Sequence, residues 1–129
     1  MGKAEDWQKK VTKELSEFDN VIVLNPRRDD WDSSWEQSID NPKFNKQVYW
    51  ELDAMEKADY IIMNFVEDTK SPISLLELGL YARSKKIFVC CPRKFWRKGN
   101  VDIVCHRYLG AIPFEDLDSL ISEFKSMIA

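Results

Sequence analysis

The chain has 129 residues, the length of one domain, so we expect a single domain over residues 1–129 with no room for a second. Hydrophobic residues make up 44% of it and charged residues 32%, which is typical of a soluble globular protein and not of a disordered or membrane chain. The net charge of -3 argues against general binding of nucleic acid or of an anionic membrane, because both require clustered cationic side chains.

The predicted elements of the first half alternate between helices and short apolar strands. Residues 3–18 carry apolar side chains at helical spacing and predict an amphipathic helix, and the apolar run at 21–24 predicts a strand covered on both faces. Residues 25–42 are polar and are bounded by Asn-Pro pairs, which indicates a long loop. A second helix is predicted over 43–57 and a second strand over 60–65.

The second half continues this alternation after a turn at 66–72. A third helix is predicted over 73–84, with Pro72 near its first turn, where a missing N–H has no cost. The next apolar strand is predicted over 87–91. The remaining predicted elements are a polar loop, a short helix, a short strand and a closing helix, at 92–100, 101–108, 111–112 and 117–128.

This order of elements predicts an α/β fold, with a doubly wound, flavodoxin-like or Rossmann-like sheet between helices. The sheet should be mainly parallel and should contain about four strands. Ligands of such sheets bind beyond the carboxyl ends of the strands, and the loops at 25–42, 66–72 and 92–100 all leave those ends. We therefore expect the binding cleft at that edge of the sheet.

The cysteines and the single histidine of the sequence do not have the spacing of metal ligands. Cys90, Cys91 and Cys105 show no Cys-x-x-Cys spacing and His106 is the only histidine, so we expect no metal and no cofactor. The first ten residues lack the apolar segment of a secretory signal, and no apolar run approaches the roughly 20 residues that span a bilayer. These features favour the reducing cytoplasm and no membrane partner.

Glu77 is the strongest candidate for chemistry, because it lies on a narrow polar stripe of an otherwise apolar predicted helix. The pattern alone fits a carboxylate that faces bulk solvent as well as one that faces a ligand. Gly79 favours the ligand, since glycine in a helix interior is unfavourable by about 1 kcal/mol relative to alanine. Glu51 on the preceding helix is either a surface acid or a second carboxylate of the same cleft, a pairing that suits cleavage of a glycosidic bond.

Four sequence segments, taken in their order and approximate spacing, are similar to those of a known protein family. These segments are NPRRDDWD, QVYWELDAMEKADYIIM, SPISLLELGLYA and FWRKGNVDIVC. Together they resemble the nucleoside 2-deoxyribosyltransferase-like family, over a similarity that extends from near Gly2 to the last helix. The resemblance implies a pentosyltransferase that transfers or cleaves the N-glycosidic bond of a (deoxy)nucleoside, in nucleoside metabolism and nucleotide salvage. It also implies a covalent glutamyl-deoxyribosyl intermediate.

The resemblance assigns roles to individual residues. Glu77 matches the family's nucleophile, and Glu51 matches the acid that lies close to the base. Ser71 and Ser74 stand nearest to the position of an aspartate that contacts the sugar in some members. Family members also take a polar residue from a neighbouring subunit, and the matching stretch runs from Asn100 to Asp102, which implies a homo-oligomer, a dimer or larger.

Substrate choice is expected to depend on the loop over residues 26–32. The polar side chains of this loop that are candidate substrate contacts are those of Arg27, Arg28 and Asp29. Trp31 and Trp35 are candidate stacking surfaces for the base, although packing within the loop or core explains each tryptophan equally well.

One departure from the family pattern concerns the sheet. Members begin with an apolar strand that precedes the first helix, and this chain starts after it. Three explanations are open. The 21–24 strand pairs directly with the 60–65 strand, or a partner supplies the missing edge strand of the sheet. Alternatively, the first residue of this sequence is internal to a longer protein.

The alternatives to a transferase are a nucleoside or nucleotide N-glycoside hydrolase and a catalytically weak nucleoside-binding module. A nucleotide substrate would give a role to the basic, aromatic stretch at 93–98, which is otherwise a solvated loop.

Overall fold

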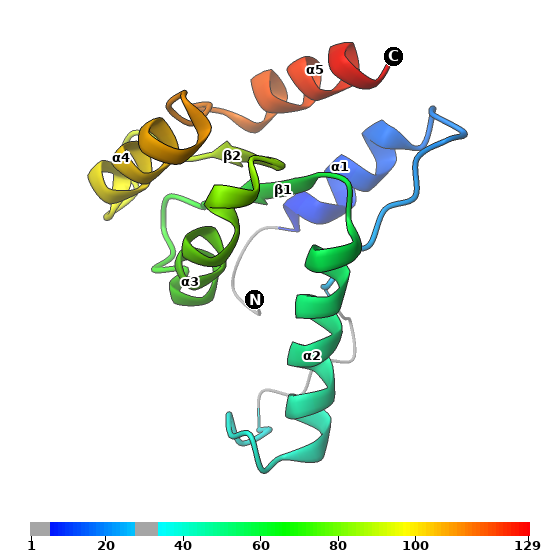
Figure 1. Ribbon diagram of the computed structural model, residues 1–129, viewed down its shortest axis with the longest axis vertical. Helices are drawn as coiled ribbons and strands as arrows, with labels where there is room; N and C mark the ends of the chain where they lie inside the picture. The colour runs from blue at the N-terminus through cyan, green and yellow to red at the C-terminus, as the bar shows by residue number, and fades with distance from the viewer. Residues whose placement is uncertain (1–5, 28–33) are drawn as a thin grey trace.

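The computed structural model describes residues 6–27 and 34–129, in which five α-helices and two β-strands follow one another along the chain (Figure 1). The predicted helices are present, and so are the strands predicted over 60–65 and 87–91. The bounds of the elements are α1 Trp7–Leu15, α2 Pro42–Lys57, β1 Ile61–Asn64, α3 Pro72–Tyr81, a 3-10 turn η1 Ala82–Ser84, β2 Ile87–Cys90, α4 Lys98–Leu109 and α5 Leu117–Ile128.

The two strands pair in parallel, with Ile61 opposite Ile87 and Asn64 opposite Cys90. Phe114 extends the sheet on the far side of β2 by a single parallel bridge to Cys90. Its N–H donates to the carbonyl of Val89 at 2.9 Å, and its own carbonyl accepts from the N–H of Cys91 at 2.8 Å. The chain between α4 and α5 is thereby fixed against the sheet.

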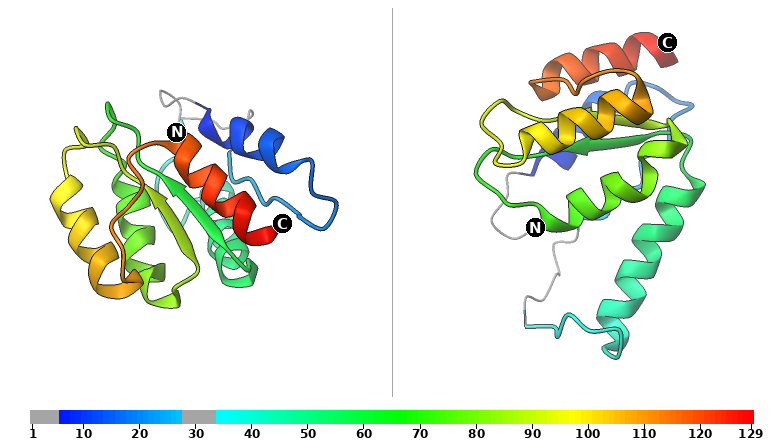
Figure 2. Two further views of the ribbon diagram at one scale, coloured as in Figure 1. Left: turned by 90° about the horizontal axis from the view of Figure 1, so that it is seen from above. Right: turned by 60° about the vertical axis from the view of Figure 1, so that its left-hand side comes forward.

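Alternate residues of the strands pack against helices on opposite faces of the sheet (Figure 2). Met63 and Val89 belong to the core under α3 and α4. Ile62 and Phe88 pack under α1 and α5. Helices therefore cover both faces of a parallel sheet, as the continuous apolar runs of the strands predict.

The expected count of about four strands is wrong for the described residues, which form two. Residues 21–24 have no regular secondary structure there, and the side chain of Ile22 is 87% exposed. A strand forms only against a neighbouring backbone, and β1 pairs only with β2 within the described ranges. Residues 111–112 are exposed, and the sheet contact forms two residues later, at Phe114.

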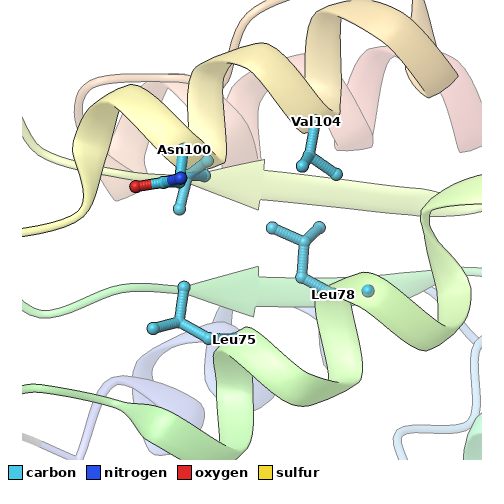
Figure 3. A pocket seen from close by; sticks show the side chains of 6 residues that line it. Leu75, Leu78, Asn100 and Val104 are labelled. Atoms are coloured by element: carbon cyan, nitrogen blue, oxygen red, sulfur yellow. The ribbon is translucent and has the colours of Figure 1, made fainter.

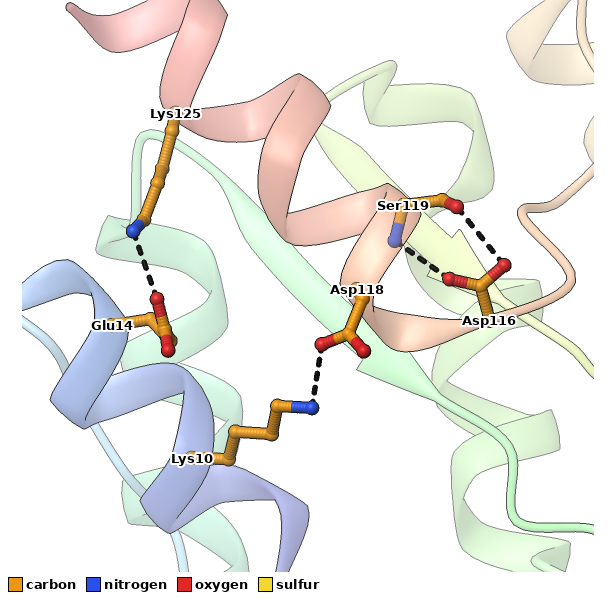
Figure 4. Close-up of polar contacts among 6 residues, drawn as sticks. All are labelled: Lys10, Glu14, Asp116, Asp118, Ser119 and Lys125. Carbon is orange, nitrogen blue, oxygen red and sulfur yellow. Dashed lines mark hydrogen bonds and ion pairs between the residues drawn. The ribbon is translucent and has the colours of Figure 1, made fainter.

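The terminal helices α1 and α5 are joined by ion pairs as well as by their apolar sides (Figure 4). Lys125 of α5 bonds at 2.9 Å each to Glu14 of α1 and to Glu17, which follows that helix, and Lys10 of α1 pairs with Asp118 of α5. These partly exposed pairs contribute little stability each, so the buried apolar contacts hold the layer together.

Candidate active site

Glu77 lies in the middle of α3, partly buried against the rest of the molecule. Burial, and to a smaller extent the nearby charge of Glu51, raise the pKa of its carboxyl to about 7. A carboxyl with this pKa exists in both protonation states at neutral pH. A carboxyl whose pKa is strongly shifted and that has a specific charged neighbour is typical of an active site. Buried ion pairs with a structural role show such pKa shifts as well.

Glu51 lies on α2 and is also partly buried. Burial raises the pKa of this carboxyl, whereas a hydrogen bond from Gln47 lowers it. Because the charge of Glu51 acts on Glu77, the structure brings the two acids into electrostatic range across α2 and α3. The carboxyl groups of Glu51 and Glu77 are thus neighbours in different environments. One of them can therefore be protonated while the other is ionised.

A contact beside the acids fixes α2 relative to α3. Tyr81 lies one helical turn after Glu77, and its buried hydroxyl donates to Glu56 Oε1 at 3.0 Å. Lys86 holds the end of α2, because its ammonium donates to the carbonyls of Met55 and Ala58 at 2.7 and 2.9 Å. These contacts hold the C-terminal end of α2 against the end of α3 and the residue before β2.

Ser71 and Ser74 lie at and just after the start of α3. Ser71 precedes the helix in a left-handed conformation, with φ 48° and ψ 50°, which is uncommon for a residue with a Cβ. Its hydroxyl lies 2.6 Å from that of Thr69 and makes no cap to the helix. Ser74 is three residues before Glu77 and therefore on the same side of α3. Ser74 therefore brings a hydroxyl group to the side of α3 that carries the carboxylate, whereas the hydroxyl of Ser71 lies next to Thr69.

The basic loop after β2 is anchored to the segment that leads into α3. Trp96 Nε1 donates to the carbonyl of Lys70 at 2.9 Å, and the Trp96 ring lies under the cations of Lys70 and Arg97, 4.4 and 4.5 Å from its centroid. Arg93 is ion-paired with Glu115 at 3.1 Å. Part of the basic character of this loop is thus used in holding the structure together.

Asn100 lies apart from Glu77. It lines a shallow, mostly aliphatic hollow of about 140 Å³ between α3 and α4 (Figure 3), which Leu75 and Gly79 also line. On a helix with about 100° between residues, each of these two positions is about 160° around the axis from Glu77. Asp102, in the first turns of α4, is paired with Lys98 at 2.8 Å. Within one chain, the Asn100–Asp102 stretch and the acid pair therefore lie on different sides of α3.

The predicted substrate loop is described only in part. Arg27 has its N–H bonded to Asn25 Oδ1 at 2.9 Å and its guanidinium 3.8 Å from the carboxylate of Asp6. Trp35 is partly buried. The other candidate contacts lie outside the described residues, and they are Arg28, Asp29 and Trp31.

The reactive groups that the described residues offer are chiefly carboxylates. Cys90, Cys91 and Cys105 are buried, and burial raises the pKa of these thiols to about 12, 11 and 12. A thiolate nucleophile is therefore disfavoured at neutral pH. Residues 6–27 and 34–129 contain no group of three or more potential metal ligands, and no helix among them has the length and apolar character needed to cross a membrane.

The chain was compared with known protein families. The model of the family described as nucleoside 2-deoxyribosyltransferase like matches residues 1–95. The chain belongs to this family. No curated protein matches it.

The nucleoside 2-deoxyribosyltransferase-like match confirms the resemblance drawn from the sequence segments. It covers both acids, Ser71 and Ser74, together with the elements from α1 to β2. The match ends at Phe95, the first residue of the segment FWRKGNVDIVC, so α4 and α5 lie beyond it. The Asn100–Asp102 stretch consequently has less support than the acid pair.

Three residues of the site region were not identified as candidates from the sequence. Tyr81 and Glu56 form the clamp between α2 and α3, and Gln47 bonds to Glu51. The spacing of Gln47 and Glu51, four residues apart on one predicted helix, could have indicated their contact. The pairing of Tyr81 with Glu56 depends on how two helices pack, which periodicity does not encode.

Proposed function

We propose that the protein is a nucleoside 2-deoxyribosyltransferase that uses Glu77 as nucleophile. The observation that carries the proposal is the partly buried Glu77, whose raised pKa and proximity to Glu51 accompany membership of this family. A nucleoside has an electrophilic C1′ and a basic leaving group, so a carboxylate and a second acid match the two ends of its glycosidic bond.

The reaction has two displacements. An oxygen of ionised Glu77 bonds to C1′ while the C1′–N bond breaks. The electron pair of the broken bond stays on the departing base, which takes up a proton from the Glu51 carboxyl. A ring nitrogen of a second base then attacks C1′, gives its proton to Glu51 and releases the Glu77 carboxylate, so that a new nucleoside forms. Attack by water instead would make the protein an N-glycoside hydrolase. Ser71 and Ser74 are proposed to hold the sugar hydroxyls by neutral hydrogen bonds.

Base exchange tests this proposal directly. Each common deoxyribonucleoside is incubated with a different free base, with the wild-type protein and with Glu77→Ala, and products are separated by liquid chromatography. We expect a new deoxyribonucleoside with the wild type only, and an added deoxyribosyl group on the Glu77 peptide after acid quenching. Equal product from both proteins would refute the role of Glu77. Released base without exchange would indicate a hydrolase, and ligand-induced thermal stabilisation without product a binding module.

A nucleotide substrate is tested in the same assay. Lys70, Arg97 and Trp96 form a cationic cluster next to the start of α3, and such a cluster is suited to a phosphate. Higher kcat/KM for a deoxynucleoside monophosphate than for its nucleoside would favour the nucleotide. Equal values would count against a phosphate role for this loop.

We also propose that the protein is a homo-oligomer through the exposed face of α3 and α4. Ile73, Leu76 and Leu80 on α3 are 60%, 61% and 55% exposed, and Ile103 on α4 is 69% exposed. Ile73, Leu76 and Leu80 lie three or four residues apart on one side of α3, and exposed apolar side chains gathered in this way typically mark an interface. A second copy seated there would bring another Asn100–Asp102 stretch close to α3.

Light scattering coupled to size-exclusion chromatography measures the oligomeric state. We expect a dimer or larger assembly for the wild type and a monomer for Leu76→Lys/Leu80→Lys, because two buried ammonium groups would oppose association. Met127→Lys on α5 is the control, since Met127 is 44% exposed and lies outside the patch. A monomeric wild type would disprove this interface.

A further inference from the structure

The side chain of Tyr81, the last residue of α3, reaches across to α2. Tyr81 is 7% exposed, and its hydroxyl donates to Glu56 Oε1 at 3.0 Å and lies 3.5 Å from the carbonyl oxygen of Leu52. Both acceptors belong to α2, and they are four residues apart, so they lie on successive turns of one side of that helix. One buried hydroxyl thus connects the end of α3 to two turns of α2.

Packing accounts for the ring of Tyr81 and leaves its hydroxyl unexplained. The ring belongs to the core cluster that also contains Leu78 and Ala82. A phenylalanine would supply the same ring without a polar group, and a buried hydroxyl is unfavourable unless it is hydrogen-bonded. A bond from a hydroxyl to a carboxylate is stronger and more sharply directed than one between neutral groups. The hydroxyl therefore fixes α2 against α3.

Lys86, the residue before β2, attaches the end of the same helix to the sheet. Its ammonium donates to three carbonyl oxygens there, those of Met55, Glu56 and Ala58, at 2.7, 3.2 and 2.9 Å. Attachment at the end alone would allow α2, which extends away from the sheet (Figure 1), to pivot about that end. The Tyr81 hydroxyl reaches one turn further toward the N-terminus of α2, so the helix is held at two points.

The Tyr81 contacts lie next to both candidate catalytic acids. Glu77 precedes Tyr81 by four residues and is therefore on the same side of α3. Glu51 directly precedes Leu52, whose carbonyl oxygen the hydroxyl approaches. A pivot of α2 would consequently move the backbone of Glu51 relative to α3.

We propose that Tyr81 is a positioning residue, whose hydroxyl holds the turn of α2 that carries Glu51 against the turn of α3 that follows Glu77. This inference rests on the proposed function, because the placement of the two acids matters for turnover only if both take part in the reaction. Tyr81 acts through the two helices and contacts neither substrate nor reacting atoms. A change at its hydroxyl should therefore affect turnover more than substrate binding.

Tyr81→Phe tests the proposal, since it removes the hydroxyl and keeps the ring. We expect kcat for base exchange to fall about tenfold to a hundredfold, as a small misplacement of a catalytic group would cause, with a smaller change in KM. Tyr108→Phe is the matched control. It also removes a hydroxyl that joins two elements, because Arg83 of η1 donates to Tyr108 of α4 at 3.3 Å, and it should leave kcat unchanged.

The contact itself is measured by a double-mutant cycle on the free energy of unfolding. Glu56→Ala breaks the same bond from an exposed position of α2, so it also provides a second variant if Tyr81→Phe does not fold. Either single change removes the bond, and the double variant should therefore be more stable than the sum of the two effects predicts. Glu56→Ala should lower kcat in the same way as Tyr81→Phe. Additive effects of the two changes would overturn the proposal.

The titration of Glu77, followed by carbon nuclear magnetic resonance of its carboxyl, separates positioning from a merely structural role. In Tyr81→Phe or Glu56→Ala the pKa of Glu77 should fall, because a loosened α2 exposes Glu77 to water and moves the charge of Glu51 away from it. A hydroxyl that only stabilises the fold would change the unfolding temperature and leave this pKa as it is.

The outcomes distinguish this inference from the proposed function. A wild type without turnover would refute the proposed function, and the pKa of Glu77 in the two variants would then decide alone whether Tyr81 positions the acids. An active wild type with unchanged kcat in Tyr81→Phe would overturn the inference and leave the function intact. A fall in kcat with an unchanged pKa of Glu77 would also overturn it. A fall in both, with coupling between Tyr81 and Glu56, would support it.

Discussion

Glu77→Gln is expected to lose base exchange by at least about a thousandfold and, at the same time, to unfold at a higher temperature above pH 7. Activity falls because an amide cannot form the ester with C1′. Stability rises because the substitution removes a partly buried charge and its repulsion from Glu51. A purely structural Glu77 would not produce both effects.

The stability effect has a defined pH dependence. The pKa of Glu77 is about 7 in the folded chain, above its ordinary 4.5, so the folded state binds the proton more tightly than the unfolded state. Its contribution to stability is fully present below pH 4.5 and is lost as the pH rises through 7. Allowing for solvent screening of a partly exposed group, we expect the wild type to lose roughly 1–2 kcal/mol relative to Glu77→Gln over that range.

Thermal unfolding of both proteins from pH 4.5 to 8 measures this difference. The two should have similar stability at the acidic end, where Glu77 is protonated, and should diverge toward pH 8. Glu123→Gln, at an exposed position of α5, is the control and should follow the wild type throughout. Parallel curves for the wild type and Glu77→Gln would contradict the raised pKa, and retained exchange would contradict the nucleophile.

Glu51→Gln should lower kcat by about 10²–10⁴-fold, the range expected when a group that transfers a proton in the transition state is removed. It should also lower the pKa of Glu77, because the charge of Glu51 contributes to raising it. The nucleophile must be ionised, so the rate rises with pH through about 7 in the wild type. In Glu51→Gln this rise should move to lower pH.

The pH profile of kcat/KM for the residual activity checks the prediction. Asp53→Asn is a suitable control, because Asp53 is an exposed acid on the same helix. It should leave both the rate and the position of the rise unchanged. A Glu51→Gln profile that coincides with the wild type at full rate would show that the two carboxyls act independently and that Glu51 is a surface acid.

Much of the architecture could be predicted from local patterns. The helix that carries Glu77 was recognisable because polar residues occupy one stripe, and the strands β1 and β2 because their apolar runs are short and continuous. The same apolar runs also predicted that helices cover both faces of the sheet. These features depend on neighbours in sequence, which periodicity reports well.

Features that depend on distant neighbours were harder to predict. Val21–Leu24 has the composition of a buried strand, but composition does not supply the adjoining backbone that a strand requires. The pKa of Glu77 depends on its burial and on the charge of Glu51, which lies on another helix. Similarly, the left-handed Ser71 could not be anticipated, because serine has no preference for that conformation.

The edge of β1 that faces away from β2 pairs with no strand among residues 6–27 and 34–129, and this has a consequence for behaviour at high concentration. Unpaired strand edges and exposed β-branched residues such as Ile22 and Val23 are templates for sheet growth between molecules. A net charge of -3 provides only weak colloidal repulsion. Pro26 limits the length of any strand that could grow from this run, because proline cannot donate to a ladder. We therefore expect Pro26 to limit association between molecules through this run.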